Sequence, residues 1–251
     1  MKIKGYIPNF ITSLNLLCGV IAVTLSFKGY EIWAIYLILA AAIFDFLDGF
    51  AARLLKAYSP MGKELDSLAD LISFGMVPAI LIMTRYERVL RALPNSSIND
   101  TVLLLLSYIP LIIVLFSALR LAKFNIDTRQ SSGFLGLPTP ANALLIAGYI
   151  HFSSFNAFFE PIEHTVWFLP LISIILSGLL VLELPMFSLK FKSLKWSENV
   201  IVYSFAIYGL ITAVLFIIFS LRWSGWIMLI LVTYIIFNII KFFILRKTKP
   251  F

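Results

Sequence analysis

Long apolar runs separated by short polar stretches constrain the fold of this 251-residue chain more than any other feature. The composition agrees with them, since 61% of residues are hydrophobic, 13% are charged and the mean hydropathy is +0.96. A soluble domain of this composition would aggregate, so we expect an all-α polytopic membrane protein with about eight transmembrane helices. The runs occupy roughly residues 10–27, 32–55, 65–83, 102–121, 141–159, 165–184, 200–219 and 226–245. The first run lacks a signal-peptide cleavage site and is expected to be a retained helix.

The positive charges between the runs orient the chain, because Lys and Arg concentrate on the cytoplasmic side of membrane proteins. With the N-terminus inside, most basic residues fall on the cytoplasmic side: Lys2, Lys4, Arg53, Lys56, Lys63, Arg120, Lys123, Arg129, Lys190, Lys192, Lys195, Lys241, Arg246, Lys247 and Lys249. The remaining basic residues fall outside: Lys28, Arg85, Arg88, Arg91 and Arg222. We therefore expect both termini in the cytoplasm, in the cell (inner) membrane. The net charge of +7 follows from this bias and suits anionic lipid headgroups, so it is no sign of nucleic-acid binding.

Four aspartates lie within apolar sequence, in the segment DFLDGFAARLLKAYSPMGKELDSLAD. They are Asp45, Asp48, Asp66 and Asp70. An ionised carboxylate at membrane depth costs about 2.5 to 3.5 kcal/mol on insertion scales, so four together require a compensating purpose. Clustered carboxylates are hard oxygen ligands, which suit Mg²⁺, Mn²⁺ or Ca²⁺.

Helical periodicity places these aspartates on two faces. Asp45, Asp48, Gly49 and Ala52 share one face, and Gly62, Asp66, Asp70 and Phe74 share another. Ser59 followed by Pro60 reads as the N-cap and first residue of a new helix. We therefore expect an antiparallel helix hairpin with its tip near residues 57 and 58. In that hairpin Asp45 would face Asp70, and Asp48 with Gly49 would face Asp66.

Residues beside the aspartates suit phosphate chemistry. Gly49 and Gly62 leave the helix surfaces bare, and Arg53 offers a forked donor for phosphate oxygens. The start of the third helix adds free backbone N–H groups near Gly62. Each residue alone also has a structural explanation, since glycines permit close helix packing and an arginine anchors a helix end. Their coincidence with four facing aspartates favours the phosphate interpretation.

The segment DFLDGFAAR, eight further residues and then GKELDSLAD resembles the signature of the CDP-alcohol phosphotransferase family, DxxDGxxAR(x8)GxxxDxxxD, at every fixed position. The resemblance covers roughly residues 5–185. It implies a six-helix membrane core (domain 1–185), usually homodimeric, and two divalent cations, Mg²⁺ or Mn²⁺. The remaining residues 186–251 would form a basic cytoplasmic loop and two additional helices without an assigned task.

The family resemblance also implies roles for single residues. It assigns metal binding to Asp45, Asp48, Asp66 and Asp70, and makes Asp70 the general base. The residues that would line the nucleotide and its phosphates are Asn9, Thr12, Asn15, Gly49, Ala52, Arg53 and Gly62.

Flanking sequences resemble one branch of the family, the membrane-integral phosphatidylserine synthases. They are IPNFITSLNLLCG at the start, LISFGMVPA after Asp70, and ALRLAKFN with GFLGLPTPANA later in the chain. This branch transfers the phosphatidyl group of CDP-diacylglycerol to L-serine, releasing CMP. Serine candidates are Ser73, Arg120, Lys123 and Asn125, although Arg120 and Lys123 would equally suit lipid phosphate or anchor a helix end. Lys123 replaces a commoner Arg in that loop.

Two alternatives remain open from the sequence. A relative could use another alcohol, such as glycerol 3-phosphate or inositol phosphate. Intramembrane carboxylates also occur in ion-coupled transporters, but we find neither an internal repeat nor a midplane site. Cys18, His151 and His164 lack ligand spacing, so we expect structural or interfacial roles for them.

Overall fold

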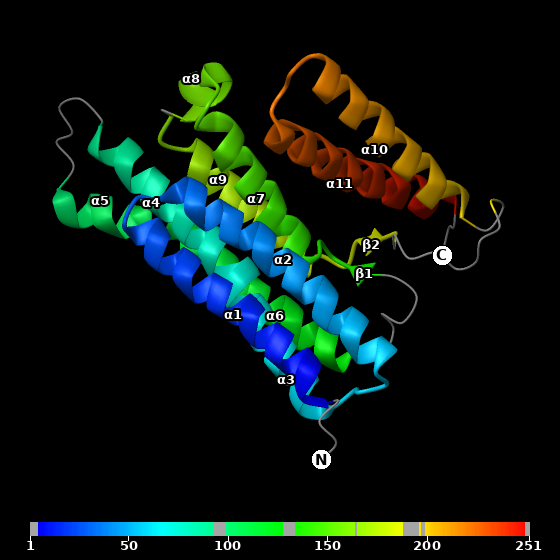
Figure 1. Cartoon of the computed structure of the whole chain (residues 1–251). Helices are drawn as coiled ribbons and strands as arrows, with labels where there is room; N and C mark the ends of the chain where they lie inside the picture. The colour runs from blue at the N-terminus through cyan, green and yellow to red at the C-terminus, as the bar shows by residue number, and fades with distance from the viewer. Residues whose placement is uncertain are drawn as a thin grey trace.

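The computed structural model describes residues 5–92, 99–127, 134–163, 165–187, 196 and 199–248. The chain is almost entirely helical (Figure 1). The first half contains α1 (Tyr6–Phe27), α2 (Glu31–Leu54), α3 (Pro60–Asp70), the π-helix η2 (Leu71–Met76), α4 (Val77–Arg91), α5 (Asp100–Ser107), the 3₁₀-helix η3 (Ile109–Leu111) and α6 (Ile112–Ile126). The second half contains β1 (Phe134–Leu135), α7 (Thr139–Ser153), the 3₁₀-helix η5 (Ala157–Phe159), α8 (Glu160–Glu163), α9 (Phe168–Val181), β2 (Pro185–Met186), α10 (Val200–Ile218) and α11 (Trp223–Thr248).

The all-α polytopic class is confirmed. Within the described residues, 6 helices are long and apolar enough to cross a membrane, or up to 7 if the bent pair of α8 and α9 counts as one span. Each of the eight apolar runs coincides with a helical segment, but α7 has only 15 residues and α9 only 14. A helix of about 20 residues is needed to cross the hydrocarbon layer without help. The two short helices therefore account for the difference between the eight predicted transmembrane helices and the 6 that are long enough to span the membrane.

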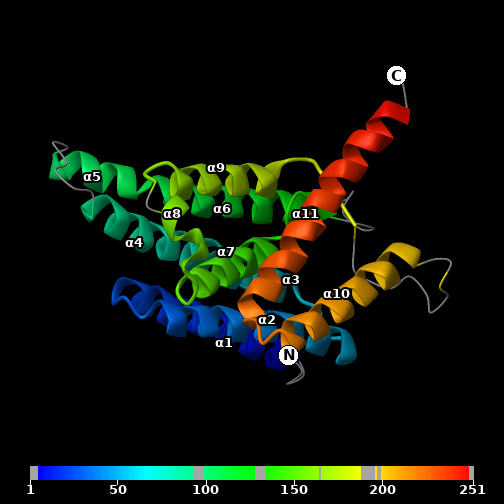
Figure 2. The same ribbon diagram turned by 90° about the horizontal axis from the view of Figure 1, so that it is seen from above.

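The continuous span formed by α3, η2 and α4 lies at the centre of the molecule. In an 18-residue apolar stretch of this span, 67% of the residues are buried inside the molecule, compared with 28% in the corresponding stretches of α1 and α2. Together with α7 it lies between a layer of α1 and α2 and a layer of α6 and α9 (Figure 2). Small residues bring these layers close, since a Cβ on Gly19 would lie 2.4 Å from Ser73 Oγ and one on Gly75 would lie 3.0 Å from Ser117 Cβ. Such contacts hold helices together where water is absent.

The helix predicted to begin at Ser59 is confirmed. Ser59 accepts a hydrogen bond from the backbone N–H of Gly62 at 3.0 Å, and Pro60 is the first helical residue. The two faces that carry the aspartates meet through their side chains, whereas the backbones of α2 and α3 make few close contacts with each other and pack mainly against α1. Helical periodicity gives the face of each residue, but it does not reveal that a third helix, α1, packs against both α2 and α3.

The helix pair at the C-terminal end joins the bundle through α11. His151, on α7, places a ring nitrogen 2.9 Å from Ser224 Oγ, which agrees with a structural role for this histidine. Tyr234 donates to the carbonyl of Phe187 at 2.9 Å, and Asn238 accepts from the N–H of Phe187 at 3.0 Å. These contacts hold the segment that contains β2 against α11.

The short strands connect this segment to the start of α7. Strand β2 pairs with β1 in antiparallel register, with Phe134 opposite Met186 and Leu135 opposite Pro185. Gly136 follows at φ +79°, where an added Cβ would lie 2.4 Å from the carbonyl oxygen of Leu180. Cys18 is a free, half-buried thiol. His164 and the basic residues Lys190, Lys192 and Lys195 lie outside the described residues.

Candidate active site

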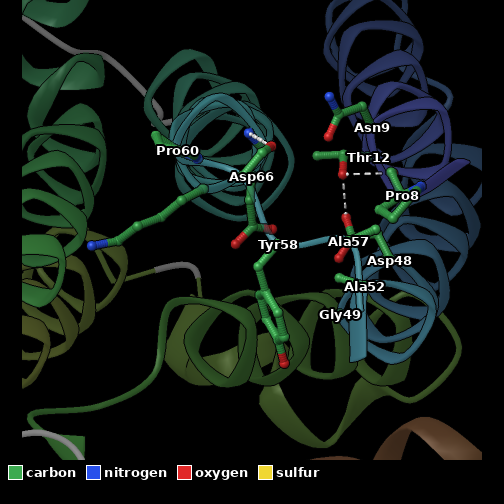
Figure 3. Close-up of a pocket in the computed structure, with 13 residues that line it drawn as sticks. Pro8, Asn9, Thr12, Asp48, Gly49, Ala52, Ala57, Tyr58, Pro60 and Asp66 are labelled. Atoms are coloured by element: carbon green, nitrogen blue, oxygen red, sulfur yellow. Dashed lines mark hydrogen bonds between the residues drawn. The ribbon is translucent and has the colours of Figure 1, made fainter. Parts of the chain in front are cut away.

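A cavity of about 520 Å³ opens between α1, α2 and α3 (Figure 3). Helix α1 packs against both α2 and α3, whose backbones make few close contacts with each other. The lining residues come from the start of α1, the end of α2, the connecting turn and the start of α3: Pro8, Asn9, Thr12, Asp48, Gly49, Ala52, Ala57, Tyr58, Ser59, Pro60, Gly62, Lys63 and Asp66. Five of the expected nucleotide residues are among them: Asn9, Thr12, Gly49, Ala52 and Gly62.

Three of the four aspartates converge beside this cavity. Asp45, Asp48 and Asp66 each offer a carboxylate oxygen, and these oxygens lie within 4.8 Å of one another. Figure 3 shows Asp66 and Asp48 on facing walls, coming from α3 and α2. Asp45 also approaches Asp66 to hydrogen-bonding contact, and it interacts electrostatically with Asp70, the residue that the hairpin register predicted it would face.

Asp48 is fixed by α1. Thr12 donates a hydrogen bond of 2.6 Å to Asp48 Oδ2, shown as a dashed line in Figure 3. Both side chains are buried, and Thr12 lies one helical turn after Pro8 in the wall of the cavity. This hydrogen bond holds the Asp48 carboxyl group at the wall of the cavity.

Asp70 lies one turn beyond Asp66 and is buried. Its Oδ1 accepts a hydrogen bond of 3.3 Å from Asn15 Nδ2, and it interacts electrostatically with Asp45. Ser73, also buried, donates to the backbone carbonyl of Asn15 at 3.0 Å. Asn15 thus connects Asp70 and Ser73, although it does not line the cavity.

The π-helix η2 begins directly after Asp70, a feature that the sequence analysis did not predict. Pro78 lies two residues beyond its end and has no backbone N–H, so the carbonyl one turn earlier lacks its usual α-helical donor. A single π turn is one way to accommodate such a gap, and π turns are frequent at functional sites. Gly75 and Pro78 are the sequence signals that could have indicated it.

The two glycines beside the cavity differ in their surroundings. A Cβ on Gly49 would meet no atom of the described residues within 4 Å, whereas one on Gly62 would lie 2.9 Å from Asn9 Oδ1 and 3.0 Å from Ser59 Oγ. Gly49 therefore leaves open space, and Gly62 permits a close approach of α3 to α1. Arg53 is exposed and is not among the residues that line this cavity. Lys63 lines it instead, a residue that the phosphate interpretation missed.

The four serine candidates have different environments. Arg120 is 6% exposed, donates from Nη1 to Thr139 Oγ1 at 2.9 Å and interacts electrostatically with Asp70. Lys123 instead forms a salt bridge of 2.7 Å with Glu183, and Asn125 donates to Ser67 Oγ at 2.9 Å. Ser73 and Arg120 are thus near Asp70, while Lys123 and Asn125 are engaged by other side chains.

The carboxylate cluster fits divalent cations. The donors are all carboxylate oxygens, which hard cations prefer. Asp66 Oδ1 is buried and has no hydrogen-bond partner among the described residues, so this lone pair is left for a ligand. Two carboxylates in contact also repel unless a proton or a cation lies between them. Asp45, Asp48 and Asp66 would hold the cations, with Asp70 adjoining them.

The sequence profile described as CDP-alcohol phosphatidyltransferase matches residues 5–187, which is most of the chain. The chain belongs to this family. The match includes the whole cavity and all four aspartates, and it ends at the segment that α11 holds. Helices α10 and α11 lie beyond it.

Three curated relatives of this CDP-alcohol phosphatidyltransferase family member carry two names. CDP-diacylglycerol–serine O-phosphatidyltransferase of Bacillus subtilis is 40% identical over 137 residues, 54% of this chain and 70% of the relative. The Methanocaldococcus jannaschii protein of the same name is 36% identical over 143 residues, covering 57% of this chain but only 59% of the relative's length. An archaetidylserine synthase of Methanothermobacter thermautotrophicus is 37% identical over 152 residues, covering 59% of this chain and 60% of the relative.

Proposed function

We propose that this protein is a CDP-diacylglycerol–serine O-phosphatidyltransferase. The proposal is supported by the names of its relatives and, most directly, by three convergent carboxylates beside a cavity that α1, α2 and α3 share. The buried Asp70 adjoins them, where an acceptor hydroxyl has to lose its proton. A transporter would be expected to have a midplane site between inverted repeats, and the sequence contains no recognisable internal repeat.

In the proposed reaction, the serine hydroxyl oxygen forms a bond to the phosphorus of the phosphatidyl group. The bond from that phosphorus to the CMP oxygen breaks, and CMP leaves with the bonding electron pair. Asp70 accepts the hydroxyl proton as general base, while Asn15 holds its carboxyl group in position. Two divalent cations, Mg²⁺ or Mn²⁺, would supply stabilisation of negative charge on the transferring phosphate and on CMP. No covalent enzyme intermediate is required.

The nucleotide would occupy the cavity. Gly49 and Ala52 would leave room for it on α2, and Asn9 and Thr12 would face it from α1. Gly62 and the N-terminal turn of α3 would offer backbone N–H groups to its phosphates. Arg53, exposed at the end of α2, would approach the phosphates from outside the cavity.

The arrangement in the cell follows from the same proposal. The catalytic core would comprise residues 1–185 in a homodimer of the inner membrane, with both termini and the cavity in the cytoplasm. The positive-inside bias of the basic residues supports this orientation. Residues 186–251 would add the basic loop and the pair α10 and α11.

The test is CMP release by protein purified in detergent with Mn²⁺ or Mg²⁺. CDP-diacylglycerol and its archaeal-type counterpart serve as donors, each with L-serine, glycerol 3-phosphate, inositol phosphate or no alcohol. We expect CMP and a serine phospholipid only with serine, and a loss of about 10²- to 10⁴-fold for Asp70→Asn, as expected for a general base.

Glu87→Gln is the matched control, because this carboxylate pairs with Arg91 at the end of α4 and lies far along the span from Asp70. CMP release with another alcohol but not with serine would agree with transferase activity of this family and would contradict serine as the acceptor. Absence of CMP under every condition, from protein that still binds Mn²⁺, would contradict transferase activity.

A further inference from the structure

A second group of polar side chains lies behind the carboxylates, inside the bundle. All of its members are at most 6% exposed. We call it the interior polar cluster, and it consists of Asn15, Ser117, Arg120, Thr139 and Asn142. Two of these residues come from α6 and two from α7, while Asn15 comes from α1. Asn142, Ser117 and Thr139 had no role in the sequence analysis.

The cluster contains buried polar atoms without partners in the described part of the chain. Both amide atoms of Asn142 are unpartnered, as are Arg120 Nε, Ser117 Oγ and Asn15 Oδ1. An unsatisfied buried polar group costs about 1 to 3 kcal/mol, and more when charged. Other buried hydroxyls avoid this cost, since Ser26 and Ser173 each donate to a carbonyl of their own helix at 2.7 Å. The concentration of unpartnered atoms therefore indicates groups that a ligand satisfies.

The cluster is contiguous with the catalytic carboxylates. Arg120 contacts Thr139 and interacts electrostatically with Asp70. Asn142 lies three residues after Thr139, so both occupy the same face of α7. Ser117 lies three residues before Arg120 on α6 and borders Gly75 of η2. Asn15 joins the cluster to Asp70 through its hydrogen bond.

The chemistry of these groups matches an amino acid. Among the described residues, Arg120 is the only buried lysine or arginine, and a guanidinium binds a carboxylate through parallel N–H donors. The amide oxygens of Asn142 and Asn15 are acceptors for an ammonium group. A doubly charged phosphate would leave these amide oxygens without donors. One cation with nearby acceptors fits a zwitterion better.

We propose that the interior polar cluster is the subsite for the acceptor's amino-acid moiety, with Arg120 binding its carboxylate and Asn142 accepting from its ammonium. The hydroxyl of the acceptor would then be directed toward Asp70. This inference rests on the proposed transferase function and deepens it, because it names the residues that select a zwitterionic alcohol. Asn142 becomes a specificity-determining residue of α7.

The experiment compares acceptors that each lack one charged group. CMP release is measured with L-serine, with ethanolamine, which lacks the carboxylate, and with 3-hydroxypropanoate, which lacks the ammonium. For Asn142→Leu we expect the KM for serine to rise about tenfold or more, with the KM for CDP-diacylglycerol unchanged. For Arg120→Met we expect the preference for serine over ethanolamine in kcat/KM to fall by about 10- to 100-fold.

The ratio of kcat/KM values is independent of the fraction of molecules that fold, so a destabilised variant still gives an answer. Ser26→Ala is the matched control, because its hydroxyl is buried but bonded within α1. Unchanged serine KM in Asn142→Leu and an unchanged ratio in Arg120→Met, with wild-type protein active on serine, would overturn the subsite alone. Wild-type protein that is inactive with serine but active with glycerol 3-phosphate would overturn the choice of serine and this subsite together.

Discussion

Charged side chains gather in two regions of the bundle, and the two groups are arranged in opposite ways. The carboxylate end consists of Asp45, Asp48, Asp66 and Asp70. The ion-pair end consists of Glu31, Arg85, Arg88 and Glu163. Asp45 follows Glu31 by fourteen residues on α2, which separates the two regions by about 20 Å at 1.5 Å per residue.

At the ion-pair end every charge has a protein partner. Arg85 lies 2.9 Å from Glu163 and 3.4 Å from Glu31, and Arg88 also contacts Glu31. Tyr149 adds a hydrogen bond to Glu163. These contacts connect α2, α4, α7 and α8, so the charges join helices to one another.

At the carboxylate end, none of the four aspartates forms a salt bridge with a described residue. Asp45 and Asp66 are instead in contact with each other, and Asp66 Oδ1 has no hydrogen-bond partner in the part of the chain that the structure describes. Like charges in a low dielectric repel strongly, so this arrangement costs stability unless a ligand offsets it. The comparison shows two uses of charge. Paired groups of opposite sign stabilise the fold, whereas a group of carboxylates without basic partners is arranged to bind a ligand.

The largest effect should come from Asp66→Asn, and it should have opposite signs for activity and stability. We expect CMP release to fall by about 10⁴-fold, or about 5 kcal/mol, because a ligand of the proposed cations is lost. The metal-free protein should become about 1 kcal/mol more stable, because a repelling charge is removed. Wild-type protein should gain about 2.7 kcal/mol from Mn²⁺ at a hundred times its Kd, and the variant should gain much less.

Glu64→Gln is the control for this prediction, since Glu64 is exposed on the same helix. Activity and thermal unfolding in detergent, with and without Mn²⁺, are the measurements. Loss of stability in metal-free Asp66→Asn would show that the carboxylate end is a structural network after all.

The next effect should come from Arg85→Met at the ion-pair end. This change leaves Glu163 and part of Glu31 unpaired and about nine-tenths buried, which costs about 3 to 4 kcal/mol of folding free energy. The activity of each folded molecule should stay close to wild type, since the proposed site is distant. Arg91→Met is the matched control, because its pair with Glu87 is exposed and contributes about 0.5 kcal/mol or less. A stable but inactive Arg85→Met variant would show that the ion-pair end contributes to catalysis. It would contradict the proposed difference between the two regions.

The sequence predicted the local helical structure of these two regions more fully than the way in which their helices pack together. The shared faces of the aspartates and the Ser59 cap follow from spacing and residue type, because both depend on neighbours within one turn. The pairing of Arg85 with Glu163 joins residues 78 positions apart, which no local pattern specifies.

The interior polar cluster shows the same limit of prediction from sequence. Asn142 appears in the sequence only as a polar residue in an apolar run, and its importance arises from burial without a partner. That property depends on how α1, α6 and α7 meet, and spacing along one helix does not determine it. The packing of α1 against both α2 and α3 is likewise a tertiary feature, and residues of all three helices line the cavity.

The smallest effect should distinguish the two glycines of the carboxylate end. In Gly62→Ala, the new methyl group would lie within 3.0 Å of Asn9 Oδ1 and Ser59 Oγ, so the Ser59 cap should weaken at a cost of about 1 kcal/mol. In Gly49→Ala nothing lies within 4 Å, and the better helix propensity should add about 0.5 to 1 kcal/mol. Thermal unfolding of the metal-free variants measures both changes. If Gly49→Ala gains stability but raises the KM for CDP-diacylglycerol, the open space on α2 serves nucleotide binding rather than the fold. An unchanged KM would contradict the assignment of Gly49 to the nucleotide. It would also contradict the use of this wall of the cavity for binding.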